Sequence, residues 1–368
     1  IMKRTCFLMN IAPRYVESAY KLFEKNLDIL WCFGSNNSDI KEMDHSFLKD
    51  VEILPTKHLK KGYFLKGATA LAFRKDIDNY VLLGEPALLN TWILPWLIKL
   101  FHPQRKVIFW THGWYGKEGF FKTIIKKIYF FPADTILTYG ERARNLMIKV
   151  GFKPAKVMAI HNSLNHEEQV ALRDTIRLSS IYKDYFNNNN PVLIFIGRLT
   201  PVKKLDMLVK AVSLLKQKGC MYNIVFVGDG SESQSLMKLV NECGLCDNVW
   251  FYGACYDEKQ NAELIYNADL CVAPGNIGLT AMHSLVFGTP ALTHNDFAWQ
   301  MPEYEAIHEG VTGCFFERNN VEALADAISN WFCEKSIKRE DVRRACYQEI
   351  DNNWTPEYEL NVLKKVLK

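Results

Sequence analysis

Two basic side chains, Arg198 and Lys203, stand five positions apart just after the apolar run 192–196. At the carboxyl end of a buried strand, a guanidinium and an ammonium can bind one diphosphate together through charge-assisted hydrogen bonds. Gly197 lets the backbone turn sharply beside a ligand, and Pro201 ends the strand character before a helical pattern begins. Because open α/β sheets bind ligands at the carboxyl ends of their strands, we expect a phosphate site here. The alternative is that both cations are only solvated.

A second glycine-marked turn, at residues 273–279, ends another apolar run and leads into a helical pattern. Free backbone amides at such a turn attract phosphate oxygens, and so does the positive end of the helix that follows. The two turns together indicate a nucleotide-sugar site. The candidates in this second turn for binding the nucleotide sugar are Asn276, Ile277, Gly278 and Leu279.

The order of apolar runs predicts the elements that position these turns. From residue 191 onward, short apolar runs alternate with amphipathic segments, which is typical of a parallel, doubly wound sheet. The first half is less regular but follows the same scheme, so we expect two similar halves with a linker at residues 187–191. Strands are predicted at residues 5–9, 29–33, 80–83, 107–110, 135–138, 157–160, 192–196, 223–227, 249–252, 270–273 and 291–293.

Composition agrees with an enzyme of two domains. A chain of 368 residues with 48% hydrophobic content can fill two cores, and a net charge of +4 gives no reason to expect nucleic acid as a partner. The amino-terminal residues read as a strand and not as a secretory signal, and the ten cysteines are scattered, which predicts reduced thiols and a cytoplasmic protein. Cys243 and Cys246 lack a second pair at metal-binding spacing, so they are interpreted as a helix end near Gly244.

One segment of the first half could attach the protein to a membrane surface. Residues 120–131 interleave lysines with large apolar side chains, and the pairs 60–61 and 74–75 add positive charge. The same segment also fits a helix packed on a sheet, with its lysines extended into solvent. A spanning helix is not expected, because residues 82–101 are broken by polar, charged and proline residues.

A series of motifs resembles retaining family-four glycosyltransferases of the GT-B architecture. The match is dense in the carboxyl-terminal half and thinner in the first half, where it depends on residues 12–15, 110–113, 133–134 and 161–164. In the carboxyl-terminal half it comprises residues 197–199 with Lys203, and then 227–230, Gly253, 268–274, 288–290, 302–303 and 309–313.

The resemblance implies two Rossmann-like, doubly wound parallel-sheet domains that face a cleft. Residues 1–170 would form the acceptor-binding domain, 171–345 the nucleotide-sugar-binding domain, and 346–368 a helix that crosses back to the first domain. It also implies transfer of a sugar from a nucleoside diphosphate to an acceptor hydroxyl, with the anomeric configuration retained. Arg198 and Lys203 would stabilise the departing diphosphate, so neither a metal nor a cofactor is expected. The expected setting is capsular, lipopolysaccharide or exopolysaccharide assembly, with a lipid-linked glycan as acceptor at the inner face of the cell membrane.

The chain departs from the family at the two glutamates that normally contact the donor sugar and the ribose, because Gly275 and His283 stand at those positions. Asn276 is the candidate to serve the sugar, and His283 could hydrogen-bond the ribose. The alternative for His283 is a helix histidine that packs against its neighbours.

The remaining site residues are assigned by the resemblance. His112, beside Gly113, would act as general base or phosphate partner, although a histidine after a strand is often structural. Glu303 would touch the sugar or cap a helix start, Tyr256 would lie near the nucleotide base, and the acceptor side would include Arg14, Tyr15 and Gly113.

Three other functions are alternatives to a transferase. A nicotinamide enzyme would need a complete G-x-G-x-x-G motif, and Gly228-Asp229-Gly230 lacks the third glycine. A nucleotide-sugar epimerase of the same fold and a non-catalytic nucleotide-sugar-binding homologue both stay open, because fold alone does not determine chemistry.

Overall fold

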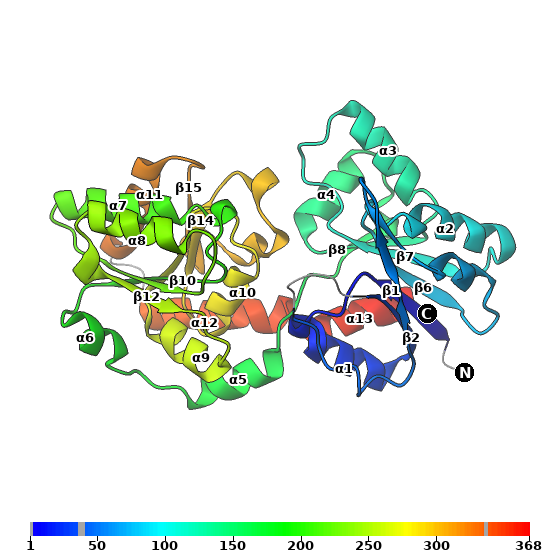
Figure 1. Ribbon diagram of the computed structural model, residues 1–368, viewed down its shortest axis with the longest axis horizontal. Coiled ribbons are helices and arrows are strands. Elements are labelled where there is room, and N and C mark those ends of the chain that lie inside the picture. Colours follow the sequence, from blue (N-terminus) through cyan, green and yellow to red (C-terminus); the bar gives the residue numbers. More distant parts are fainter. Residues whose placement is uncertain (1–2, 36–40, 335–337) are drawn as a thin grey trace. The chain divides into compact units, whose positions relative to one another are not determined.

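The computed structural model describes residues 3–35, 41–334 and 338–368 (Figure 1). The chain divides into two compact units. Unit 1 contains Ile1–Asn165 and Thr355–Lys368, and unit 2 contains His166–Trp354. Within the described residues, no helix combines the length and the apolar character needed to cross a bilayer.

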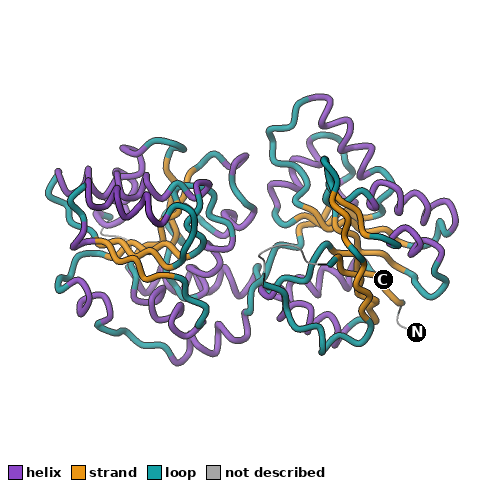
Figure 2. Tube along the Cα trace, in the orientation of Figure 1, coloured by secondary structure: helices purple, strands orange, loops and turns teal. Residues whose placement is uncertain are grey.

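Unit 1 is built on a parallel sheet that has helices on both faces (Figure 2). Within the described residues its strand order is β3-β2-β1-β6-β7-β8-β9, and the short strands β4 and β5 form a separate antiparallel pair. The strands are β1 (Arg4–Met9), β2 (Asp28–Gly34), β3 (Val51–Leu54), β4 (Thr56–His58), β5 (Tyr63–Leu65), β6 (Asn79–Leu83), β7 (Lys106–Thr111), β8 (Thr135–Thr138) and β9 (Val157–Ala159). The helices are α1 (Glu17–Asn26), α2 (Asn90–Phe101), α3 (Phe120–Phe130), α4 (Glu141–Lys149) and α13 (Pro356–Val366).

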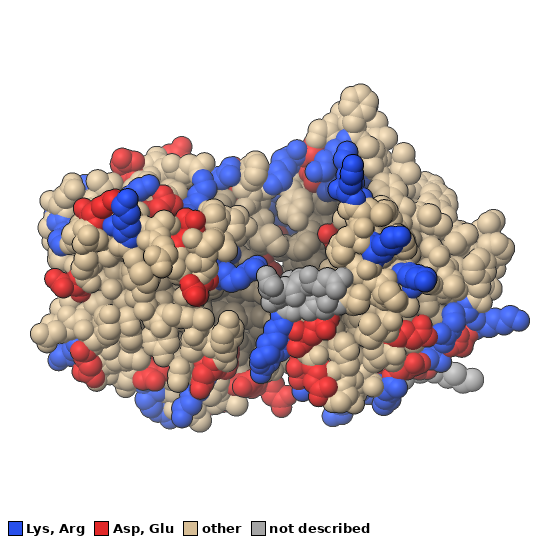
Figure 3. All heavy atoms as spheres, viewed as in Figure 1, with Lys and Arg blue, Asp and Glu red and all other residues tan. Residues whose placement is uncertain are grey.

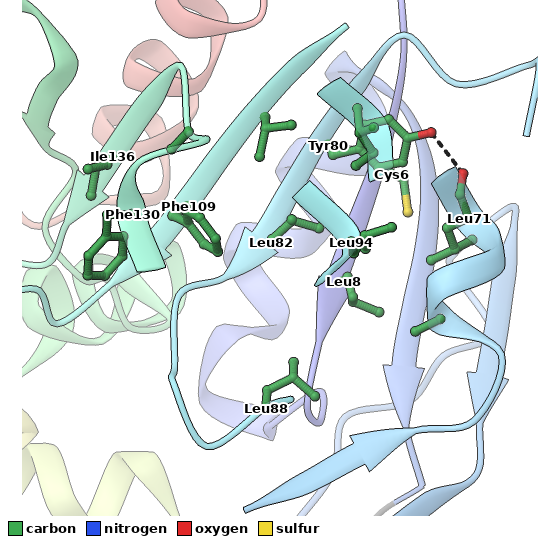
Figure 4. Packing of buried hydrophobic residues seen from close by; sticks show 14 of the residues in the cluster. Cys6, Leu8, Leu71, Tyr80, Leu82, Leu88, Leu94, Phe109, Phe130 and Ile136 are labelled. Atoms are coloured by element: carbon green, nitrogen blue, oxygen red, sulfur yellow. Dashed lines mark hydrogen bonds between the residues drawn. The ribbon is translucent and has the colours of Figure 1, made fainter. Parts of the chain in front are cut away.

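The core of unit 1 lies on both faces of this sheet, and β1 shows why. Successive side chains of a strand point to opposite faces. Cys6 and Leu8 therefore join the cluster beneath α2, α3 and α4, and Phe7 and Met9 join the cluster beneath α1 and α13. Figure 4 shows the first cluster, in which the Tyr80 hydroxyl donates to the Leu71 carbonyl at 2.9 Å. The near-continuous apolar sequence of β1 follows from this double coverage.

Unit 2 repeats the scheme with the strand order β12-β11-β10-β13-β14-β15 within the described residues, again all parallel. The strands are β10 (Val192–Ile196), β11 (Asn223–Val227), β12 (Val249–Gly253), β13 (Leu270–Ala273), β14 (Ala291–His294) and β15 (Gly313–Phe316). The helices are α5 (His166–Thr175), α6 (Ile181–Phe186), α7 (Leu205–Gln217), α8 (Ser233–Glu242), α9 (Glu258–Asn267), α10 (Leu279–Val286), α11 (Val321–Cys333) and α12 (Arg339–Asn353). Two doubly wound parallel sheets are therefore confirmed.

The boundaries between the units differ from the predicted ones at residues 170 and 345. The first boundary falls before α5, because the Gln169 side chain of that helix donates to Glu258 of α9 at 2.7 Å and holds α5 in unit 2. The second falls after α12, whose Arg339 donates to the Ala268 carbonyl at 2.6 Å. Only the helix that begins at Pro356 returns to unit 1, where it packs in the same cluster as α1.

The linker predicted at residues 187–191 is wrong. These residues lie inside unit 2, between α6 and β10. The Asn223 side-chain amide donates to Asn188 Oδ1 at 2.8 Å, so this polar run is fixed against the start of β11. The asparagines suggest a solvated linker in the sequence. In the structure they form hydrogen bonds with backbone and side-chain groups at one end of the sheet.

Candidate functional site

The two predicted turns meet at the carboxyl edge of the unit 2 sheet. β10 and β13 are neighbours, and the following strands extend from them in opposite directions, β11 beside β10 and β14 beside β13. Such a reversal of strand order is the point where doubly wound sheets bind ligands. Residues 197–203 follow β10 and residues 274–278 follow β13, so both turns lie at this point.

Glycines allow the loops at this edge to lie against one another. The Gly275 amide donates to the Lys203 carbonyl at 2.9 Å, and a Cβ on residue 275 would lie 2.0 Å from the Val202 carbonyl oxygen. A Cβ on Gly228 would lie 1.9 Å from the Gly197 carbonyl oxygen. A side chain at either position would force the loops apart, so these glycines are explained by backbone contact.

The Lys203 ammonium joins the two turns. Its Nζ donates to the carbonyl oxygen of Asn276 at 2.8 Å and to Asn276 Oδ1 at 2.9 Å, and it lies 3.4 Å from the Ile277 carbonyl oxygen. Burial lowers the pKa of Lys203 to about 8, while the field of Glu303 opposes this shift and the field of Arg198 adds to it. These oxygens are neutral, so the positive charge is not cancelled by direct contact with a carboxylate.

Arg198 completes a pair of cations at this edge. Its side chain is exposed and makes no hydrogen bond or ion pair with another residue of the described chain. Its charge nevertheless lies near enough to lower the pKa of Lys203. The predicted cationic pair is therefore present, with one member bound to the second turn and the other open to solvent.

The second turn was predicted to offer free amides, and for two of its residues this is wrong. The Gly275 amide is used by Lys203, and the Ile277 amide donates to Gln300 Oε1 at 3.0 Å. The Gln300 side chain is buried, and its Nε2 donates to Thr293 Oγ1 at 2.8 Å. Gln300, which the sequence did not reveal, therefore holds the turn in place. No side chain of the described residues caps α10, which begins after Gly278, so the positive end of that helix is available to an anion.

His283 lies one turn into α10, next to a carboxylate that the sequence also did not reveal. Its Nδ1 is 3.8 Å from Glu258 Oε1, the same oxygen that accepts the hydrogen bond from Gln169. Tyr256, just before α9, is 86% exposed, and Glu303 is buried. The structure thus brings Lys203 together with the turn at 276–278, with Arg198 and Glu303 within electrostatic range. Within the described residues, no side-chain hydrogen bond or ion pair joins His283 or Tyr256 to that turn.

Unit 1 places its predicted site residues at the carboxyl ends of its own strands. His112 follows β7, and its ring packs on Tyr139 with centroids 4.6 Å apart. Burial lowers the pKa of His112 to about 4, so the imidazole is neutral at pH 7. Gly113 is buried and donates its amide to Thr111 Oγ1 at 3.0 Å. Arg14 and Tyr15 follow β1 and are exposed.

The loop after His112 is fixed by a buried ion pair. The Lys126 ammonium donates to Glu118 Oε1 and to the Gly113 carbonyl, each at 2.7 Å. Burial alone would raise the pKa of the Glu118 carboxyl. The Lys126 hydrogen bond and the amides of Tyr115 and Gly116 outweigh this effect and hold that pKa at about 2.

The chain contains one Asp-x-Asp spacing, a pair of carboxylates of the kind that can hold a metal ion, at Asp76 and Asp78. Both residues precede β6, at the amino end of the unit 1 sheet. Asp76 pairs with Arg74 at 2.7 Å and with Arg4 at 3.0 Å, and Asp78 accepts the Arg4 amide at 3.0 Å. These carboxylates therefore have structural partners at the sheet edge opposite to the one where ligands bind.

Comparison with known proteins shows similarity to glycosyltransferases. Residues 181–349 match the model of the family described as glycosyl transferases group 1. A putative glycosyltransferase of Bacillus subtilis, EpsD, is 24% identical over 249 residues, which cover 64% of this chain and 62% of EpsD.

A second curated relative is the GDP-mannose-dependent alpha-(1-6)-phosphatidylinositol monomannoside mannosyltransferase of Mycobacterium tuberculosis. It is 23% identical over 172 residues, which cover 44% of this chain and 43% of the relative. The matched regions therefore span about two fifths to three fifths of these relatives.

Among solved structures, HepE of Anabaena in complex with UDP has a similar fold. The TM-score is 0.74 at 15% identity, over 99% of both chains. The predicted GT-B architecture of two Rossmann-like domains is thereby confirmed.

Proposed function

We propose that the chain is a family-four glycosyltransferase that transfers a sugar from a nucleoside diphosphate to an acceptor hydroxyl with the anomeric configuration retained, and its similarity to glycosyltransferases supports this. The observation that carries this proposal is the cationic pair Arg198 and Lys203 at the switch point of the unit 2 sheet, beside the amino end of α10. A departing diphosphate gains negative charge as the glycosidic bond breaks, and fixed positive groups lower the energy of that transition state.

The three positive groups have different tasks in this proposal. Arg198 is free to form paired hydrogen bonds to phosphate oxygens. Lys203 orients the turn at 276–278 through its carbonyl contacts and adds its charge to the same oxygens. The α10 terminus supplies a dipole that needs no side-chain movement. No divalent ion takes part, so turnover in a metal chelator should equal turnover with added magnesium.

The other proposed roles concern the sugar, the base and the acceptor. Leu279 and Gly197 line the phosphate position, while Asn276 and Glu303 contact the sugar. His283 contacts the ribose, and Tyr256 lies by the base. In unit 1, neutral His112 acts at the reacting sugar, and Arg14, Tyr15 and Gly113 belong to the acceptor side. A neutral imidazole fits this role, because it can accept a proton or a hydrogen bond at pH 7.

For the acceptor we propose a lipid-linked glycan in surface-polysaccharide assembly, with the protein held peripherally at the inner face of the cell membrane through unit 1. A glycolipid is the substrate in the printed name of the Mycobacterium tuberculosis relative, which supports an acceptor of this class. The donor is a nucleoside-diphosphate sugar. The HepE complexes with UDP and UDP-glucose, and the GDP-mannose dependence of the mycobacterial relative, make both bases worth testing.

A donor screen tests the proposal. The full chain is incubated with a panel of UDP- and GDP-sugars and a lipid-linked glycan extract, and nucleotide release and glycan mass are measured together. We expect one donor to release its nucleoside diphosphate and one acceptor to gain the mass of the sugar, with the anomeric proton showing the configuration of the donor. An altered sugar nucleotide without an acceptor product would instead identify an epimerase. Binding without turnover would identify a non-catalytic protein.

A further inference from the structure

Helix α3 carries its apolar stripe on the outside of unit 1. Phe120 and Phe121 are 75% and 79% exposed, and the isoleucines that continue the same face of the helix are between 40% and 55% exposed. The opposite face, with Lys126 and Tyr129, is the one that is buried against the sheet. An ordinary surface helix has the reverse arrangement, with apolar side chains inward and charges outward.

Helix α2 extends this surface. Its residues Ile93, Trp96 and Leu100 are exposed, and the Trp96 ring stacks on Phe131 at the end of α3 with centroids 5.8 Å apart. We call the combined region the α2–α3 surface; its exposed apolar members are Phe73, Ile93, Trp96, Leu100, Phe101, Phe120, Phe121, Ile124, Ile125, Ile128 and Phe131. Contiguous exposed apolar area of this kind marks an interaction site.

The charged residues of α2 and α3 themselves are all lysines, and the carboxylate beside them is Asp134, which pairs with Lys99 of α2 at 2.6 Å. Neither helix contains Asp or Glu, while Lys122 and Lys127 are exposed on α3 and have no acidic partner among the described residues. Lys156 donates to the Phe131 carbonyl at 3.0 Å and adds a cation at the end of the helix. On the face drawn in Figure 3, Lys and Arg atoms stand beside the mostly uncharged surface of α3.

We propose that the α2–α3 surface binds the headgroup region of a bilayer that contains anionic lipids, with Phe120 and Phe121 as the side chains that enter the acyl boundary. Apolar and aromatic side chains combined with lysines are the composition of helices that lie in a membrane interface. The centres of protein–protein interfaces are depleted in lysine, which disfavours a protein as the occupant. Lysines near an anionic lipid surface add an electrostatic attraction that salt weakens.

The inner face of α3 is held firmly by unit 1, so the helix can bind a membrane without changing its place in the fold. The buried pair of Lys126 and Glu118, together with the Gly113 contact, ties the inner face of α3 to the loop that follows His112. The helix can therefore present its outer face to lipid without leaving the core. This inference deepens the proposed position at a membrane, because a lipid-linked acceptor would lie in the same layer as the helix.

Sedimentation with lipid vesicles tests the inference independently of catalysis. The full chain is mixed with vesicles of phosphatidylcholine alone or with added phosphatidylglycerol, at low and at high salt. We expect binding to the anionic vesicles that weakens as salt rises. The double substitution Phe120→Ser/Phe121→Ser should weaken this binding at least about tenfold, because each buried large apolar side chain contributes roughly 1.5–3 kcal/mol.

A matched control is Leu178→Ser, which removes a side chain that is 74% exposed in unit 2 and should leave vesicle binding unchanged. Donor hydrolysis by the double variant should also stay at the wild-type rate, which separates lipid binding from the proposed function and shows that the variant is folded. Equal vesicle binding by wild type and double variant would overturn the inference. So would a concentration-dependent dimer of the wild type that binds no vesicles and becomes monomeric in the double variant, because a second copy would then be the occupant.

Discussion

Two lysines with low solvent exposure lie beside loops that follow strands, Lys126 buried in unit 1 and Lys203 partly buried in unit 2, and their partners differ. In unit 1, Lys126 contacts the carboxylate of Glu118 at 2.7 Å. In unit 2, Lys203 contacts neutral oxygens of Asn276 and Ile277. The first charge is cancelled within the protein and fixes a loop. The second stays uncancelled at close range and has the exposed guanidinium of Arg198 nearby, so it can attract an anion.

This difference indicates which loop is built for structure and which for binding. A neutralised buried pair contributes little long-range field, whereas two cations with no carboxylate in direct contact, at the end of a parallel sheet, can attract an anion. The same residue type therefore serves two purposes, and only its contacts distinguish them. The following predictions test this distinction, beginning with the largest expected effect.

Removing one member of the unit 1 pair should cost stability. Lys126→Met leaves the Glu118 carboxylate buried without its cation, and such a change typically costs about 3–5 kcal/mol. Hydrogen exchange measures the effect by region. Amides of residues 113–130 should exchange faster, while peptides of unit 2 keep the exchange rates of the wild type.

The double variant Lys126→Met/Glu118→Gln is the control for this prediction. With both charges gone, no isolated carboxylate is left, and part of the lost protection should return. Unchanged protection in the single variant would mean that the pair does not fix the loop.

The unit 2 lysine should instead respond to pH. A lysine is positive below its pKa, so Lys203 loses its charge as pH rises through about 8. The kcat/KM for donor turnover should therefore fall about tenfold per pH unit above that value if the charge is required. Lys203→Arg should remove this alkaline limb, whatever its effect on the maximal rate. An identical limb in the arginine variant would assign it to another group.

Gln300 should have the smallest effect of the three. Gln300→Met removes the acceptor of the Ile277 amide and leaves that buried N–H group without a partner. This should destabilise the native conformation of the turn by about 1–3 kcal/mol. We expect kcat/KM for the donor to fall about tenfold, with the alkaline limb of Lys203 preserved. Because Gln300 acts by positioning, Gln300→Glu, which keeps the acceptor oxygen, should restore part of the rate. A loss of the alkaline limb would contradict a pure positioning role.

Apolar runs predict most of the sheet framework of this chain. The predicted bounds of β8, β10, β11 and β13 agree with the structure, because a fully buried parallel strand must be apolar on both faces. The strands that were not predicted, β3, β4, β5 and β15, are three or four residues long. β4 is polar and largely exposed, and β15 begins with glycine. Neither therefore shows the alternation or the apolar run by which a strand is recognised in a sequence.

For the site, local sequence indicates the turns but not the contacts between distant segments. Arg198 and Lys203 can be found because they follow a buried strand at close spacing. Gln300 and Glu258 cannot, since their importance comes from the Ile277 amide and from His283, which lie far away along the chain. The family pattern even marks a carboxylate as missing at His283, whereas the fold brings Glu258 to within 3.8 Å of that imidazole.

The most direct test of the central claim is the rate at which each variant releases nucleoside diphosphate from the donor that the screen identifies. Lys203→Ala should lower this rate by about a hundredfold or more, as expected for loss of a charge that stabilises a leaving group. Lys204→Ala changes the next residue, whose ammonium bonds to Asn319 instead, and should stay within a fewfold of wild type, which is the range of an ordinary surface substitution. Equal rates in wild type and Lys203→Ala would contradict the assignment of this turn as the place where the diphosphate leaves.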